Sequence, residues 1–459
     1  MLKMFSVRPQ EGIKLEFTWL TFGLFFILFF TSLNGFVDSI DYEYGATDSW
    51  QCTFLGDPND RHADLIKLSI STVSSPPPNL SEWPSHYLDF YTNNPYGNVG
   101  AVSRGRLTAF HSLPLALLVV TGIGNGILLT GPVFTTIVFY AVALTLLWLA
   151  CWYFVSTSWE RIFAFSVLAL GYPFMVILSR ANVGSLVAGF ALIFYIYLCC
   201  NRRHLLIAGI CLAVACNVRP NAVLLAPLFL CFGLRKSIGG VALFLLMAGA
   251  IASVCYAIAV KVYPGYSFSV FLQALDIYQS LYVFGSMGDG NNNSAYGALK
   301  VLYEMLLIGT SPRLLTAVNQ FILLLGVGFI AFASYRFWRG LLPAYYFAFV
   351  ITGVYILAST VIATYHMFVL YVFILAAGCK TAESGTFPSI LVLMAALILI
   401  PKNYIYMFPG VSCEVILNPL ILSICLGWIL SRKFPVQTEL STEDSMRTAP
   451  EVRTKKRRR

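Results

Sequence analysis

The sequence has few charged residues, because Asp, Glu, Lys and Arg together make up 11% of its 459 residues. A domain that meets water on all sides carries about 25%, so the composition excludes a soluble enzyme and a disordered chain. Apolar residues reach 58% and the mean hydropathy is +0.75. This balance is typical of a polytopic membrane protein, and it excludes a small disulfide-rich secreted domain.

Several motifs of cofactor and metal chemistry are also missing. The chain contains no CxxC, no HExxH, no GxxxxGK[ST] and no convincing GxGxxG, so the sequence offers no zinc site, P-loop or Rossmann fingerprint. Most of the 11 cysteines fall in apolar segments, where a free Cys behaves as a small apolar residue. Cys52 and Cys413 lie in predicted outer loops, which leaves one disulfide between them open in an oxidising compartment.

What the chain has in abundance is apolar segments of roughly 13 to 25 residues, the range near which a helix crosses a bilayer. We predict an all-α polytopic membrane protein with about twelve transmembrane helices, both termini on the same side. The segments are 17-36, 131-155, 162-178, 183-200, 205-217, 221-234, 238-262, 315-334, 341-362, 366-378, 387-401 and 415-431.

The positively charged residues set the orientation of these segments. A cytoplasmic N-terminus places 20 of the 30 Lys and Arg residues inside, as the positive-inside rule requires. Seven of them lie within 447–459, so the net charge of +9 reflects a tail and no basic face for nucleic acid. Segment 107-128 is apolar enough to span, but it contains Pro114 and three glycines, so we expect it to lie at the outer interface.

This topology gives one membrane-embedded catalytic unit, residues 1-434, with two long loops on the outer side. The first, 37-130, carries the interfacial helices, and the second is 263-314. Residues 435-459 form a basic cytoplasmic tail that we expect to be disordered. Since long loops occur on one side only, we place the chemistry on that side.

Carboxylates follow the first apolar segment. Asp38 and Asp41 come directly after it, and Asp89 lies further along the same predicted loop. A carboxylate held at a membrane surface can act as a general base toward an acceptor hydroxyl. The alternative is an acidic, solvated end of a span. His111 lies in the interfacial segment, where, taken alone, a histidine without a catalytic role is expected more than a catalytic one.

Two arginines stand at predicted outer ends of spans, each beside an asparagine. Arg180 is followed by Asn182, and Arg219 is preceded by Asn217. The planar guanidinium group suits bidentate contact with phosphate oxygens, so the four residues predict a phosphate site. The alternative is a pair of snorkelling anchors. The apolar segments around Arg219 are too short to cross as lone helices, which places it near a cavity.

Two further motifs lie in the second half of the chain. His366 begins a short apolar segment, where an imidazole can donate a hydrogen bond to phosphate, transfer a proton or serve a structural role. The run Asn292, Asn293 and Ser294 can contact a polar ligand or form a solvated turn. In a eukaryote it would also be a glycosylation sequon.

Taken in order, these motifs resemble those of the C-type glycosyltransferases, which are integral membrane enzymes, and most closely those of glycosyltransferase family 87. The order covers about residues 15 to 380, although the first loop is longer than usual and a Tyr-Pro-Pro element is reduced to Pro114. Asp41-Tyr42-Glu43 is similar to the branch that uses dolichyl-phosphate-glucose, whereas Asp89 fits family 87. The similar stretches are Asp89-Phe90-Tyr91, His111-Ser112-Leu113-Pro114, Arg180-Ala181-Asn182, Arg219-Pro220, Asn292-Asn293-Ser294 and His366.

The resemblance implies a transferase that moves a hexose of the mannose or glucose class, or a pentose, from a polyprenyl-phosphate donor. The acceptor would be a hydroxyl of a glycolipid or glycan on the non-cytoplasmic face. No cofactor is implied, and a divalent metal stays open. The membrane would be a bacterial inner membrane with a periplasmic site, or the endoplasmic reticulum with a lumenal one. The implied roles are catalysis for Asp41, Asp89 and His366, donor phosphate binding for Arg180, Arg219, Asn182 and Asn217, and substrate contact for His111, Asn292, Asn293 and Ser294.

Other classes fit part of the pattern. A membrane polymerase or ligase for lipid-linked glycans also places Arg and His in outer loops. A secondary transporter also has about twelve spans and short broken helices, but we find no internal repeat, and the long loops on one side favour the transferase. A scaffold protein would leave the outer Arg, Asp and His residues without a role.

Overall fold

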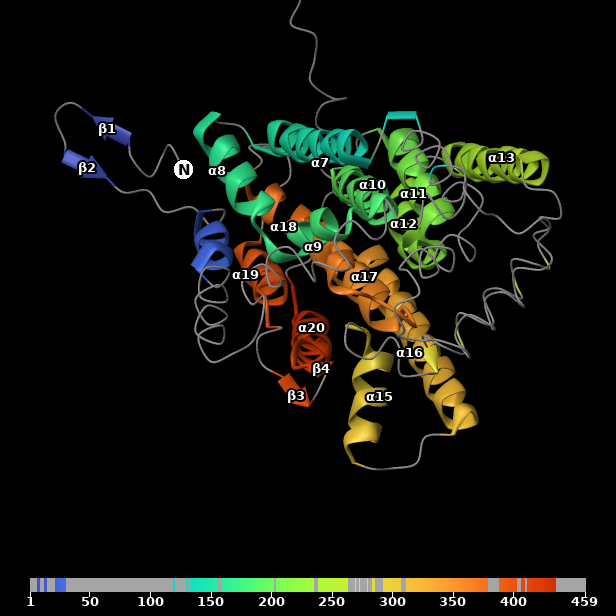
Figure 1. Cartoon of the computed structure of the whole chain (residues 1–459). Helices are drawn as coiled ribbons and strands as arrows, with labels where there is room; N and C mark the ends of the chain where they lie inside the picture. The colour runs from blue at the N-terminus through green and yellow to red at the C-terminus, as the bar shows by residue number, and fades with distance from the viewer. Residues whose placement is uncertain are drawn as a thin grey trace, which may run out of the picture.

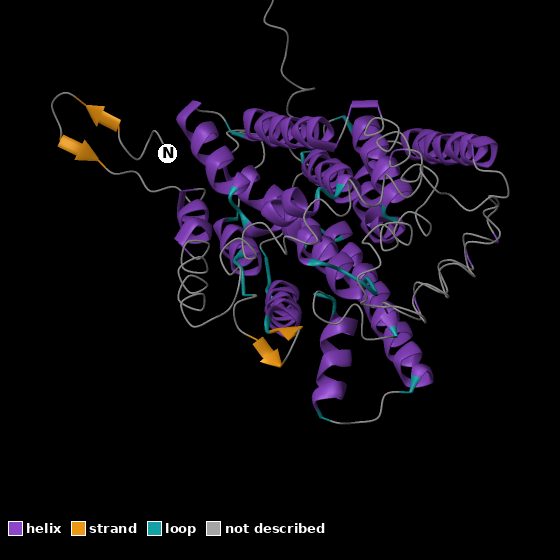
Figure 2. Ribbon diagram, in the orientation of Figure 1, coloured by secondary structure: helices purple, strands orange, loops and turns teal. Residues whose placement is uncertain are grey.

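The computed structural model is almost entirely helical, with two short antiparallel strand pairs (Figures 1 and 2). It describes residues 6-8, 12-14, 21-29, 119, 129-130, 132-155, 158-201, 204-234, 238-262, 269, 272, 279, 283-284, 292-306, 311-378, 388-402, 406-408 and 411-434. The strand pairs are β1 (Ser6–Arg8) with β2 (Gly12–Lys14), and β3 (Tyr406–Phe408) with β4 (Val411–Ser412). The helices of the described residues include α7 (Pro132–Phe154), α8 (Ser158–Ala169), α9 (Tyr172–Arg180), α10 (Val183–Cys200), α11 (Leu205–Val218), η4 (Pro220–Leu225), α12 (Ala226–Leu234), α13 (Ile238–Val262), α15 (Ala295–Met305), α16 (Pro312–Trp338), α17 (Ala344–Ala358), η7 (Thr364–Leu370), α18 (Tyr371–Leu375), η8 (Ala376–Gly378), α19 (Ser389–Leu399) and α20 (Glu414–Ser431).

Every apolar segment predicted from residue 131 onward is occupied by a helix or by consecutive helices. Among the described residues, four helices are long and apolar enough to cross a membrane, or five if the bent pair α8 and α9 is one span. The other apolar helices are shorter, so the total of twelve spans stays a prediction. The long helices are compatible with an integral membrane protein; they include Phe134–Phe154, Val183–Cys200, Pro312–Trp338 and Glu414–Ser431.

Of the four long apolar helices in the described part of the chain, α16 is the least buried and α10 the most buried. On α16, large apolar side chains are exposed, including Phe321 at 59% and Leu324 at 69%. On α10, most side chains are buried. Because exposed apolar surface of this extent is unfavourable in water, α16 points to a lipid environment.

The bend between α8 and α9 measures 65°, and the side chain of Tyr371 contacts the backbone there. The Tyr371 hydroxyl donates to the carbonyl of Leu168 over 3.0 Å, which satisfies a backbone group that the bend exposes. A Cβ atom at Gly171 would collide with this hydroxyl, so only glycine allows the close approach. The bend leads into Arg180, the last residue of α9.

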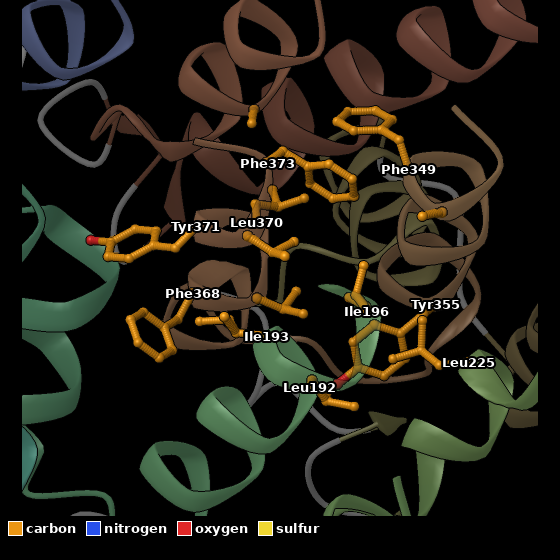
Figure 3. Packing of buried hydrophobic residues seen from close by; sticks show 14 of the residues in the cluster. Leu192, Ile193, Ile196, Leu225, Phe349, Tyr355, Phe368, Leu370, Tyr371 and Phe373 are labelled. Atoms are coloured by element: carbon orange, nitrogen blue, oxygen red, sulfur yellow. The ribbon is translucent and has the colours of Figure 1, made fainter. Parts of the chain in front are cut away.

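The core lies around α10, η7, α17 and α18 (Figure 3). Phe368 of η7 meets Phe190 of α10 with ring centroids 4.9 Å apart. Phe373 of α18 meets Phe349 of α17 at 5.0 Å. The segment that carries His366 is therefore anchored on the central helices.

Contacts at one end of the helices join connections that the topology places inside. The Arg336 guanidinium donates to the carbonyl of Leu430 and, over 2.6 Å, to that of Arg432. At the same end, Asn201 donates to the Tyr345 hydroxyl over 3.1 Å. The connections predicted to be cytoplasmic thus meet one another.

Candidate functional site

The opposite end, which we call the Arg219 end, contains Arg219, Asn221 and the described residues 292-294, 359-364, 400-402 and 411-414. Of the predicted site residues, Asp38, Asp41, Asp89 and His111 lie outside the described residues, as do the tail 435-459 and nearly all of loop 37-130. The others are described, namely Arg180, Asn182, Asn217, Arg219, Asn292, Asn293, Ser294 and His366.

Arg219 lies between α11 and η4 and has an extended backbone, and the following Pro220 prevents α11 from continuing. Its Nη2 donates to the Ser185 hydroxyl over 2.9 Å. Ser185 also donates its backbone N–H to the Asn182 side chain over 2.7 Å, which caps α10. Two predicted residues, Arg219 and Asn182, are therefore joined through Ser185, and this contact uses one of five guanidinium N–H groups.

The other predicted phosphate-binding residues have different surroundings. Arg180 ends α9 and is partly buried, and the chain turns after it through Ala181 in the left-handed region, with φ of 50°. Asn217 donates back to the Ala213 carbonyl of its own helix over 2.9 Å. Asn221, to which we assigned no role, reaches across to the Ser359 hydroxyl over 3.1 Å.

His366 presents a defined tautomer. The Ala363 N–H donates to its Nδ1 over 3.0 Å, so Nδ1 carries no proton and Nε2 holds the ring hydrogen. This Nε2 atom is buried and has no hydrogen-bond partner among the described residues. The charge of Arg219 acts electrostatically on the ring. The ring thus offers a neutral N–H donor within electrostatic range of a cation, which is an arrangement that suits an anion.

The run Asn292, Asn293 and Ser294 is buried, and its side chains form hydrogen bonds with other residues of the same chain. Asn292 donates to the Thr360 carbonyl over 2.9 Å and accepts from the Ile362 N–H over 3.0 Å. Ser294 caps α15 by accepting from the Gly297 N–H over 3.0 Å. These bonds attach the run to connection 359-364, and with 3% of its surface exposed Asn292 is not an accessible glycosylation site in this structure.

A buried polar network next to this run was not predicted. It joins Lys402 through Asn418, Asn293 and Thr364 to Glu414 by side-chain hydrogen bonds of 2.7, 2.9, 3.1 and 2.7 Å in that order. The sequence carried a signal, because Lys402 and Glu414 are isolated charges that flank apolar segments 387-401 and 415-431. Ionisable residues at such positions are costly and therefore informative.

Lys402 is the basic residue of this network, and its pKa is shifted. Burial lowers its pKa from 10.5 to about 8, although the Glu414 carboxylate opposes this shift. The neighbouring Cys413 is a free cysteine whose Sγ donates to the Lys402 carbonyl over 3.2 Å. The disulfide to Cys52 that the sequence left open is thus not formed in this structure, and Cys52 lies outside the described residues.

Among the described residues, no group of three or more His, Cys, Asp or Glu side chains could hold a metal ion. The carboxylates that left a divalent metal open, Asp41 and Asp89, are outside that part of the chain. Comparisons of the chain with protein-family models, with curated proteins and with solved structures found no match.

Proposed function

We propose that the protein is a membrane glycosyltransferase of the C type. It moves a hexose of the mannose or glucose class, or a pentose, from a polyprenyl-phosphate-linked donor to a hydroxyl of a glycolipid or glycan acceptor. The proposal includes about twelve spans and an active site on the non-cytoplasmic face. The membrane is a bacterial inner membrane, or alternatively that of the endoplasmic reticulum.

The observation that carries the proposal is that the charge of Arg219 acts on the ring of His366, whose Nε2–H is buried and has no hydrogen-bond partner among the described residues. A phosphodiester between polyprenol and sugar has one negative charge, which one guanidinium group matches. Both donors are fixed before the ligand arrives, Arg219 by Ser185 and His366 by Ala363. Fixed donors of this kind stabilise the charge that develops on a leaving phosphate.

In the proposed reaction the acceptor oxygen attacks the anomeric carbon and the bond from that carbon to the phosphate oxygen breaks. The acceptor proton passes to the carboxylate of Asp41 or Asp89, and the electron pair of the broken bond remains on the polyprenyl phosphate. Arg219 and His366 bind that phosphate. Asn182 is joined to Arg219 through Ser185, and Arg180 lies two residues before Asn182. The chemistry follows general-base catalysis with electrostatic stabilisation of the leaving group.

A membrane polymerase or ligase for lipid-linked glycans would need the same anion site and remains a variant of this proposal. A secondary transporter for an anionic solute is the second candidate. It is favoured by the interrupted helices α8 with α9 and η4 with α12, since discontinuous helices are typical of transporter binding sites.

The test is retention of lipid by the purified protein in nanodiscs. We would incubate wild type, Arg219→Ala and the control Arg339→Ala with a panel of polyprenyl-phosphate sugars and free polyprenyl phosphate, and identify retained lipid by mass spectrometry. Arg339 directly follows the last residue of α16, away from the Arg219 end, and its guanidinium carbon lies 6.0 Å from the centre of the Tyr335 ring. We expect wild type and Arg339→Ala to retain one lipid-phosphate sugar and Arg219→Ala to lose it. Binding of a water-soluble anion without lipid would favour the transporter.

A further inference from the structure

Five buried side chains at the Arg219 end form a hydrogen-bonded chain in which every donor points the same way. Lys402 donates to Asn418, Asn418 to Asn293, Asn293 to Thr364, and Thr364 to Glu414. An ammonium group only donates and a carboxylate only accepts. The two ends therefore fix the orientation of both amides and of the hydroxyl between them.

The ends of this chain are charges enclosed by protein. Lys402 is 6% exposed and Glu414 is 2% exposed. The ammonium group has three acceptors, the carbonyls of Ile398 and Ile400 and the Asn418 side chain, at 3.3, 3.0 and 2.7 Å. Three acceptors match its three protons, so its hydrogen-bonding capacity is filled within the protein. Such a group holds neighbours in place and is not arranged to bind a ligand itself.

The network is attached to the segment that carries His366. The Asn293 N–H donates to the Ile362 carbonyl over 2.6 Å, and Thr364 belongs to the network and begins η7. His366 follows two residues later, and its Nδ1 is bound by the Ala363 N–H. The first turn of η7, and with it the direction of Nε2–H, is therefore set by residues on both sides of Thr364.

We infer that Glu414 and Thr364 are positioning residues for His366, with Asn293, Asn418 and Lys402 completing the device. Glu414 accepts a hydrogen bond from the Thr364 hydroxyl and so fixes the start of η7. The fixed start of η7 in turn orients the His366 Nε2–H toward the bound phosphate. The inference rests on the proposed transferase function for its effect on turnover. In this inference Asn292 and Asn293 hold connection 359-364 in position, and they do not contact the substrate.

Four variants test the inference in nanodiscs. Thr364→Val removes the hydroxyl at nearly constant shape, and Thr364→Ser restores it. Glu414→Gln replaces a carboxylate, which only accepts, with an amide that both accepts and donates, so the end of the chain no longer fixes the direction of the Thr364 hydroxyl. Thr352→Val is the matched control, because Thr352 is also fully buried but its Oγ1 has no hydrogen-bond partner among the described residues. The measurements are kcat and KM for the retained donor, and the rate at which diethyl pyrocarbonate modifies His366 without substrate, followed by mass spectrometry.

We expect Thr364→Val and Glu414→Gln to lower kcat by about 10- to 100-fold, the effect of a small misplacement of a group that binds the transition state. KM should change by about twofold or less, since fixed binding by Arg219 persists. Both variants should also change the modification rate of His366, whereas Thr364→Ser and Thr352→Val should behave as wild type in both measurements.

The two readouts separate the two ideas. If wild type retains no lipid and transfers no sugar, the transferase proposal fails, and the modification rate alone judges the positioning of His366. If wild type is active but Thr364→Val and Glu414→Gln match Thr352→Val in kcat and in modification rate, the positioning inference is overturned and the transferase proposal stands. Should Thr364→Val fail to fold, Glu414→Gln against Thr352→Val decides by the same criteria.

Discussion

Tyr195 donates its hydroxyl hydrogen to the Leu225 carbonyl over 2.7 Å, across thirty residues of sequence. The same hydroxyl accepts from the Phe229 N–H over 2.9 Å. In a regular helix the N–H of residue 229 would bond to the carbonyl of residue 225. The tyrosine hydroxyl is therefore inserted into the backbone ladder where η4 passes into α12, at Leu225, six residues after Arg219. Inserted groups of this kind produce kinks.

Tyr195→Phe should destabilise the protein, because it removes the bridge and leaves a buried N–H and a buried carbonyl without their partner. We expect a loss of about 1–3 kcal/mol in the free energy of unfolding. Thermal or denaturant unfolding in detergent micelles measures it. Tyr335→Phe, at an exposed tyrosine of α16, is the control and should stay within about 0.5 kcal/mol of wild type. Equal stability of the two variants would remove the bridging role of Tyr195.

Gly189→Ala should strain the contact between α10 and η7. A Cβ atom at Gly189 would lie 2.6 Å from Cδ1 of Phe368, which is fully buried and two residues from His366. Overpacking of this kind costs about 1–3 kcal/mol, so the unfolding temperature should fall. Because the displaced residue adjoins His366, donor turnover should fall as well.

Gly249→Ala on α13 is the matched control for this glycine, since nothing lies within 4 Å of a Cβ atom there. Alanine favours a helix over glycine by about 0.5–1 kcal/mol. The control should therefore leave stability unchanged or raise it. A fall of the same size in both variants would show that the contact with Phe368 does not decide the result.

The sequence predicted the helices better than their contacts. The predicted segment 183-200 coincides with α10, because an unbroken apolar run flanked by polar residues defines both ends locally. The start of α10 is equally local, since Asn182 caps it through Ser185. Neither feature depends on a distant part of the chain.

The site was predicted only in part, for the opposite reason. Arg219 and His366 are residues whose chemistry can be recognised individually, and in the structure the charge of Arg219 acts on the His366 ring. The network of Lys402 and Glu414 depends on hydrogen bonds between distant parts of the sequence, and the one from Asn418 to Asn293, of 2.9 Å, crosses 125 residues. Single-sequence patterns contain no measure of such proximity, so the run Asn292 to Ser294 was interpreted as a ligand contact.

Stability should rise with pH in the alkaline range because of Lys402. Burial lowers its pKa from 10.5 to about 8 in the folded protein, whereas the unfolded chain keeps the ordinary value. Between these values the unfolded state binds more protons than the folded state, so raising the pH favours folding. The full pKa difference corresponds to about 3 kcal/mol.

The measurement is the free energy of unfolding of wild type and Lys402→Met at intervals from pH 7 to pH 10. Methionine has a similar length and no charge, so its profile contains the titration of every other group. Wild type should gain stability relative to Lys402→Met as the pH passes 8. Parallel profiles would show that Lys402 has an ordinary pKa in the folded state.

Asp41→Asn and Asp89→Asn should separate catalysis from donor binding. Loss of a general base lowers turnover by about 100- to 10,000-fold, and an amide of the same shape preserves the surroundings of the carboxylate. Because the proposed phosphate contacts belong to Arg219 and His366, both variants should retain the lipid-linked donor in nanodiscs, and one of them should no longer transfer sugar. Asp38→Asn tests the third carboxylate in the same way. Arg219→Ala should show the reverse pattern, with donor retention lost. If all three Asp variants transfer sugar at the wild-type rate, the general base is none of these carboxylates and the catalytic role assigned to the first outer loop is wrong.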